Sequence, residues 1–145
     1  SIPLSWWKPI LDAKDVEFVN LQYTDSQEDV DLMGALGYNI KCVDPIVKAG
    51  DYYETARLVA SCDLIISVCT SLVHLAGALG VPCWVMTPKN PAWRYQNSGG
   101  MPWYRSVRLY RSPDVSQHAW LPVIDRIAFD LQQLIAGHSN VRKIV

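Results

Sequence analysis

The sequence lacks acidic residues over a long stretch. Residues 64 to 113 contain no Asp or Glu, although the whole chain has 14 acidic residues. The stretch does contain basic residues, namely Lys89, Arg94, Arg105, Arg108 and Arg111, and therefore carries a formal charge of +5. An anion bound there would meet no competing carboxylate. Solvated surface arginines that fall in this stretch by chance are the alternative explanation.

The chain also lacks the signatures of several functional classes. Its net charge of -1 provides no overall basic surface for nucleic acid. No basic region followed by an apolar core stands at the amino end, so no signal peptide is visible. The absence of G-x-G-x-x-G, Walker A and G-x-S-x-G motifs disfavours nicotinamide dehydrogenases, P-loop enzymes and α/β-hydrolases.

The cysteines and histidines have no metal-ligand spacing. The four cysteines, at positions 42, 62, 69 and 83, show neither the pairs of a zinc site nor the density of a disulfide scaffold. We therefore expect reduced, mostly buried thiols in a cytoplasmic protein, with no metal and no cofactor. A nucleophilic pair of Cys69 and His74 is an alternative, because a helix start lowers a thiol pKa. No third group that would orient the pair is apparent.

Apolar runs alternate with helical patterns along the chain. Its 145 residues, half of them hydrophobic, predict one domain with a substantial core. The expected strands are residues 16 to 22, 39 to 43, 64 to 68, 83 to 87 and 107 to 111. The expected helices are residues 26 to 36, 52 to 62, 69 to 80 and 122 to 136, and a Pro-, Gly- and aromatic-rich loop covers 88 to 106. This order predicts an α/β fold with a Rossmann-like parallel sheet and helices on both faces.

Residues 64 to 86 would be long enough to cross a bilayer. His74, the hydroxyl residues before it and the break from Gly80 to Pro82 favour strand, helix and strand instead. In such sheets, ligands bind outside the carboxyl ends of the strands, where the amides of a following helix attract anions. Thr70 and Ser71 occupy that turn, and His74 follows Thr70 by one helical turn. The alternatives are that Thr70 or Ser71 simply caps the helix and that His74 packs on the sheet.

The stretch "DLIISVCTSLVHLAGALGVPCWVM" resembles the nucleotide-sugar motif in the C-terminal domain of heptosyltransferase-like GT-B glycosyltransferases. "PAWRY" and "MPWYRSVRLYR" resemble the branch often linked to tetratricopeptide repeats, and the similarity runs from "SIPLSWWKPIL" to "HAWLPVIDRI". It implies that Thr70, Ser71 and Leu72 bind the donor diphosphate and that His74 supports the loop. Cys69 stands where the family has an acidic residue. A sugar contact or charge-dependent step that the family assigns to that acidic residue therefore has no carboxylate here.

The same resemblance implies further contacts with a nucleotide-sugar donor. Gln22, Tyr23, Val43 and Asp44 would flank the nucleoside. Lys89, Trp93 and Arg94 would approach the diphosphate or the sugar. A plain aromatic plug is the structural alternative for "PAWRY" and "MPWY".

Relatives in that family have a strand and a glycine-containing loop before the "SIPL" helix, and a separate N-terminal domain. The resemblance therefore implies that residues 1 to 145 are the donor-binding half of a longer two-domain glycosyltransferase, inactive alone, whose acceptor is a protein or glycan. A non-catalytic binding domain with the same fold and a sugar-nucleotide epimerase are the alternatives, and the acid-free stretch disfavours the epimerase.

The strand that this resemblance places upstream would be central in a sheet of order 3-2-1-4-5. We therefore predict that residues 16 to 22 and 64 to 68 do not pair with each other. We also expect an upstream strand of a longer polypeptide to fill the place between them.

Overall fold

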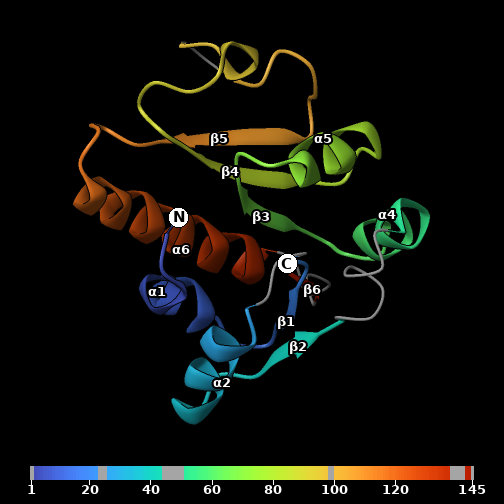
Figure 1. The fold of residues 1–145 in the computed structure, drawn as a ribbon, viewed down its shortest axis with the longest axis vertical. Coiled ribbons are helices and arrows are strands. Elements are labelled where there is room, and N and C mark those ends of the chain that lie inside the picture. Colours follow the sequence, from blue (N-terminus) through green and yellow to red (C-terminus); the bar gives the residue numbers. More distant parts are fainter. Residues whose placement is uncertain (1, 23–25, 44–50, 98–99, 138–142, 145) are drawn as a thin grey trace.

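Two three-stranded parallel sheets form the centre of the protein, with helices on both faces (Figure 1). The structure, a computed structural model, describes residues 2–22, 26–43, 51–97, 100–137 and 143–144. The predicted α/β fold with a Rossmann-like alternation of parallel strands and helices is confirmed.

The first sheet has the order β2-β1-β6. Its strands are β1 (Glu17–Asn20), β2 (Ile40–Cys42) and β6 (Lys143–Ile144). The helical segments around it are η1 (Leu4–Trp7), α1 (Lys8–Leu11) and α2 (Gln27–Ala35). The predicted strands 16 to 22 and 39 to 43 are present but shorter. The two-residue strand β6 was not predicted, because two residues carry no periodic pattern.

The second sheet has the order β3-β4-β5 and contains the acid-free stretch. Its strands are β3 (Ile65–Val68), β4 (Cys83–Thr87) and β5 (Val107–Arg111). The helices that cover it are α4 (Tyr52–Ala60), α5 (Ser71–Ala78) and α6 (Trp120–Gly137). Two short 3-10 helices, η2 (Trp93–Tyr95) and η3 (Gln117–Ala119), lie in the connections.

Residues 64 to 86 fold as β3, α5 and β4 rather than as one helix. Gly80 follows α5 with a φ of 71°, a left-handed conformation that glycine adopts without steric cost. Pro82 follows and excludes a continued helix. None of the helices in the described ranges has the length and apolar character required to cross a membrane.

Two apolar clusters cover the opposite faces of the second sheet. On one face, Ile65 and Val85 pack with Val73 of α5 and Val59 of α4. On the other face, α6 and α1 pack on the sheet. The side chains of this second cluster include Leu64, Ile66, Met86, Ile127, Leu131 and Ile10. Successive residues of β3 thus enter different cores. This explains why β3 is apolar except for Ser67, without the polar alternation of a half-exposed strand.

The facing edges of the two sheets are not paired with each other. In the described part of the chain, β1 pairs with β2 and β6, and β3 pairs only with β4. The prediction that residues 16 to 22 and 64 to 68 are not ladder neighbours is therefore confirmed. Figure 1 shows β1 and β6 on one side of the resulting gap and β3 on the other.

Candidate functional site

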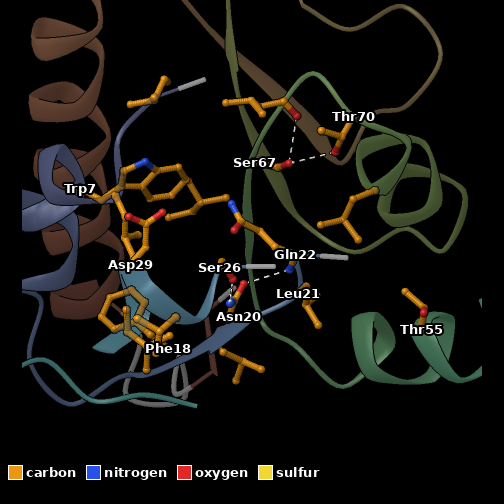
Figure 2. A pocket seen from close by; sticks show the side chains of 18 of the residues that line it. Trp7, Phe18, Asn20, Leu21, Gln22, Ser26, Asp29, Thr55, Ser67 and Thr70 are labelled. Atoms are coloured by element: carbon orange, nitrogen blue, oxygen red, sulfur yellow. Dashed lines mark hydrogen bonds between the residues drawn. The ribbon is translucent and has the colours of Figure 1, made fainter. Parts of the chain in front are cut away.

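A cavity of about 630 Å³ lies between the two sheets, where β1 and β3 face each other without pairing. Its walls are mostly apolar. The apolar lining residues come from the amino end, β1, β3 and α5, and include Ile2, Trp7, Phe18, Val19, Ile66, Val68 and Leu75. Polar side chains gather where β1 and β3 end (Figure 2). These polar side chains therefore lie at the carboxyl ends of the strands, where α/β sheets bind ligands.

The polar residues at this end are held by short hydrogen bonds. The hydroxyl groups of Ser67 and Thr70 lie 3.3 Å apart, and Ser67 Oγ donates to the Val68 carbonyl at 2.9 Å. On the β1 side, Asn20 Nδ2 donates to Ser26 Oγ at 2.8 Å. Asn20 Oδ1 accepts a hydrogen bond from the Gln22 amide at 2.9 Å. Figure 2 shows Ser67 and Thr70 across the cavity from Asn20.

Helix α5 begins at the edge of this cavity. Thr70 is its N-cap residue and has extended backbone angles, but its side chain makes no capping hydrogen bond. The Thr70 hydroxyl contacts Ser67 instead. Ser71 and Leu72 follow and also line the cavity. The first amides of a helix have no partner within the helix. At the start of α5 the Thr70 side chain does not accept from them either, so they are available as donors to a ligand.

His74 lies on a different side of α5 from the cavity. Its ring contacts Tyr104 edge-on, with ring centroids 5.8 Å apart, and Tyr95 at 6.1 Å. It is absent from the cavity lining, whereas Thr70 and Ser71 contribute to it. His74 therefore packs among aromatic side chains of the loop after β4 rather than on the sheet. His74 can therefore affect Thr70 only by changing the position of α5.

Cys69 precedes the helix start and lies near two arginines. Burial raises the pKa of the Cys69 thiol, while a hydrogen bond with Tyr95 and the charges of Arg111 and Arg94 lower it in part. The thiol also contacts the Met86 carbonyl at 3.8 Å. A raised pKa keeps the thiol protonated at neutral pH, which is the opposite of what an activated nucleophile needs. The charges of Arg111 and Arg94 therefore act on the residue before Thr70.

Arg111 was not predicted as a site residue. Its Nη2 donates to the Gln96 carbonyl at 2.9 Å, while its buried Nη1 has no hydrogen-bond partner among the described residues. Thr87, its register partner at the end of β4, is fully buried and its hydroxyl is likewise without a described partner. Both residues end parallel strands at the ligand-binding edge. Their pairing depends on the sheet register, which the sequence does not contain.

The other basic residues of the acid-free stretch have different surroundings. Arg108 forms a 2.9 Å ion pair with Asp130 and lies over the Tyr110 ring. Lys89 and Arg105 are exposed. The acid-free stretch therefore does not act as one positive patch. Arg94 and Arg111 are the two arginines whose charges act on Cys69.

The aromatic loop is divided between core and surface. Tyr95 is buried and packs with the first apolar cluster, together with Met101 and Tyr104. Trp93 and Trp103 are 78% and 58% exposed and contact each other edge-on. The plug alternative fits the tyrosines, whereas the tryptophans are free to contact other molecules.

The structure brings together four of the predicted site residues at the cavity, namely Gln22, Thr70, Ser71 and Leu72. Val43 packs against the first apolar cluster and does not line the cavity. Tyr23 and Asp44 fall outside the described residues. Asn20 and Ser67 line the cavity and were not predicted, because their strands continue with apolar neighbours that gave no separate signal.

No cluster of three or more His, Cys, Asp or Glu side chains suited to a metal ion occurs within the described ranges. The fold and the cavity together define a Rossmann-like α/β domain with a polar, uncapped helix start at the ligand-binding edge.

Comparison with known proteins adds one similarity. The chain is 33% identical over 136 residues to Protein FlbA of Caulobacter vibrioides, a match that covers 93% of this chain and 22% of that protein. The chain thus spans less than a quarter of the relative. No protein-family profile matches the chain, and no solved structure matches it.

Proposed function

We propose that this chain binds the diphosphate of a nucleotide-sugar at the start of α5, as the donor-binding half of a glycosyltransferase whose acceptor is a protein or glycan. The observation that carries the proposal is the start of α5. Thr70 leaves the first amides without a side-chain cap, and Thr70, Ser71 and Leu72 line one cavity. Helix amides and the helix dipole favour phosphate at such a position.

Charges beside the helix start favour an anion there. Arg94 and Arg111 lower the pKa of Cys69, directly before Thr70, and residues 64 to 113 contain no Asp or Glu, although Asp29 of α2 lines the same cavity. Arg111 does not line the cavity, but its Nη1 is buried and has no described partner, so an anion that reached it would satisfy a donor that is otherwise costly to bury. In a transferase, the same groups would stabilise the departing diphosphate.

A non-catalytic nucleotide-binding domain is the second candidate. Cys69 favours it, because the resemblance places an acidic residue at this position and the Cys69 thiol is kept neutral by burial. Both candidates require the diphosphate site. Transfer of sugar by the full-length protein would distinguish them, since only the first candidate predicts it.

The amide of Ser71 gives a direct test of the site. Ser71 is the first residue of α5, a position where proline is compatible with a helix, and Thr70 before it is already extended. Ser71→Pro removes the amide donor, whereas Ser71→Ala removes only the hydroxyl. Because a hydrogen bond to a charged group contributes about 1.5 to 3 kcal/mol, we expect Ser71→Pro to weaken diphosphate binding about 10- to 100-fold.

Titration calorimetry with the four common ribonucleoside diphosphates measures this change. Ser71→Ala is the matched control and should bind more tightly than Ser71→Pro. Far-UV circular dichroism verifies that both variants keep their helices. Equal affinity of the wild type and a folded Ser71→Pro variant would place the nucleotide elsewhere.

Arg94 provides a second, electrostatic test. If its charge faces the diphosphate, Arg94→Ala should weaken binding and flatten the dependence of affinity on salt, because an ionic contact is screened by ions. We expect a loss of about 1 kcal/mol or more at low salt for this partly buried arginine. Arg105→Ala is the control, since Arg105 is exposed in the same acid-free stretch. An Arg94→Ala variant with wild-type affinity at low salt would identify Arg94 as a surface residue without a role in binding.

A further inference from the structure

The loop after β4 contains a strained backbone position directly after η2. Gln96 has φ and ψ angles of 51° and 177°, a combination that residues with a side chain rarely adopt. Such a conformation persists only where the surrounding structure holds it. Arg111 Nη2 donates to the Gln96 carbonyl at 2.9 Å and to the Tyr95 carbonyl at 3.4 Å. One guanidinium nitrogen therefore holds both residues that follow Arg94.

Arg111 is itself anchored to the second sheet. It ends β5, where it is the register partner of Thr87, and the next amide, that of Ser112, donates to the Thr87 carbonyl at 2.8 Å. Its guanidinium is a planar, rigid fork of donors, and its Nη1 is buried. Hydrogen bonds from a charged donor are roughly twice as strong as those between neutral groups. Arg111 thus joins the strained turn of the loop to the end of a paired strand.

The segment that Arg111 holds contains two side chains that act at the start of α5. The Tyr95 side chain is buried and shares a hydrogen bond with the Cys69 thiol, directly before Thr70. The charge of Arg94 lowers the pKa of the same thiol. Trp103 Nε1 donates to the Arg94 carbonyl at 3.1 Å, so the backbone at Arg94 is held from the other side as well. The position of the Arg94 charge therefore depends on the conformation of this loop.

We propose that Arg111 is a positioning residue of the site at α5: it holds η2 and Gln96 in the strained conformation and thereby keeps the Arg94 guanidinium beside Cys69. The loop carbonyls engage Arg111 Nη2, and Arg111 does not line the cavity, so its main contribution to the site passes through Arg94. The consequence for diphosphate binding rests on the proposed function. The position of Arg94 does not, and it can be measured without a nucleotide.

The nucleotide-free test is the pH profile of Cys69 alkylation by iodoacetamide, resolved by mass spectrometry of the peptide that contains Cys69. The thiolate is the reactive form, so the midpoint of the profile reports the thiol pKa. Arg94→Ala should shift the midpoint to higher pH, because a nearby cation favours the thiolate. In an Arg111→Ala background, Arg94→Ala should cause no further shift, since the Arg94 charge has then already moved away. An equal shift in both backgrounds, or no shift in the wild type, would overturn the proposal.

Arg108→Ala is the matched background. Arg108 is exposed on the same strand and forms an ion pair with Asp130, whereas the arginine charges that act on Cys69 are those of Arg111 and Arg94. The shift that Arg94→Ala causes should keep its full size in this background. Its loss would mean that any change in β5 displaces Arg94, and the assignment to Arg111 would fail.

Gln96→Pro tests the same contact from the loop side, and it covers the case in which Arg111→Ala does not fold. Proline fixes φ at about −65°, so it cannot adopt the Gln96 φ of 51°, while both arginines remain in the protein. Gln96 is exposed, and far-UV circular dichroism should show unchanged helices. Arg94→Ala should not shift the Cys69 profile in this background. A full shift there would overturn the proposal, because Arg94 would then keep its place without the strained turn.

Titration calorimetry measures the consequence for binding, with the ribonucleoside diphosphate that binds the wild type most tightly. Arg94→Ala should weaken binding at low salt by about fivefold or more in the wild type, and by less than about twofold in the Arg111→Ala and Gln96→Pro backgrounds. Equal losses in all three backgrounds would overturn the positioning role. Absence of nucleotide binding by every protein would contradict the proposed function instead, and the alkylation profiles would still decide whether Arg111 places Arg94.

Discussion

Leu131→Ala is expected to cost about 2 to 5 kcal/mol of the free energy of unfolding. Leu131 is fully buried on α6 and belongs to the apolar cluster that joins this helix to β3, β4 and α1. Truncation removes its apolar contacts and leaves a void between a helix and a sheet that cannot collapse freely. For a chain of this length, the loss corresponds to a fall in the melting temperature of roughly 7 to 16 °C.

Phe129→Ala is the matched control for Leu131→Ala. Phe129 lies on the same helix, two residues away, and is 61% exposed. Its truncation should change stability by only about 0.5 kcal/mol, in the range of ordinary surface substitutions. Urea unfolding followed by circular dichroism measures both variants. Equal losses would show that α6 does not pack on the sheet through the face that contains Leu131.

Gly77→Ala is expected to destabilise the protein by about 1 to 3 kcal/mol, although alanine normally stabilises a helix relative to glycine. A Cβ atom on Gly77 would overlap the Tyr104 ring and would lie 2.8 Å from Tyr104 Cδ1. The overlap involves Cγ, Cδ1 and Cδ2 of Tyr104, the part of the ring nearest the backbone, so the whole Tyr104 side chain must move. Because Tyr104 also contacts His74, the change should displace the loop after β4 from α5.

Gly34→Ala is the control for Gly77→Ala. Gly34 lies in α2 and a Cβ atom there would meet nothing within 4 Å, so alanine should be neutral or stabilising by up to about 1 kcal/mol. The penalty at Gly77 should also shrink in a Tyr104→Ala background, since the overlapping ring is then absent. Thermal unfolding of the wild type, the three single variants Gly34→Ala, Gly77→Ala and Tyr104→Ala, and the Gly77→Ala, Tyr104→Ala double variant measures both effects. A stabilising Gly77→Ala variant would mean that Tyr104 does not pack against α5.

The alternation of strands and helices could be predicted because buried parallel strands, and the glycines that end helices, leave local signals in the sequence. The runs at 64 to 68 and 83 to 87 are mostly apolar because both of their faces are covered, and Gly80 marks the end of α5. The start of α5 was predicted for the same reason, since a hydroxyl pair between strand and helix is a local pattern. These features depend on neighbours in the chain.

The features that the sequence did not predict depend on distant contacts. His74 turns toward Tyr95 and Tyr104, which follow it by 21 and 30 residues, and no spacing rule relates residues so far apart. Arg111 and Thr87 meet through the register of β4 and β5. Strand β6 consists of two residues that pair with the start of β1 and carry no pattern of their own.

The central claim is that a diphosphate binds at the start of α5. The most direct measurement is a crystal structure of the protein soaked with the ribonucleoside diphosphate that raises its melting temperature most, since a ligand of the folded state stabilises it. The account predicts phosphate oxygens within about 3.2 Å of the Ser71 or Leu72 amide, with the Arg94 or Arg111 guanidinium on the same group. Phosphate density away from residues 70 to 72, with those amides free of it, would contradict the account.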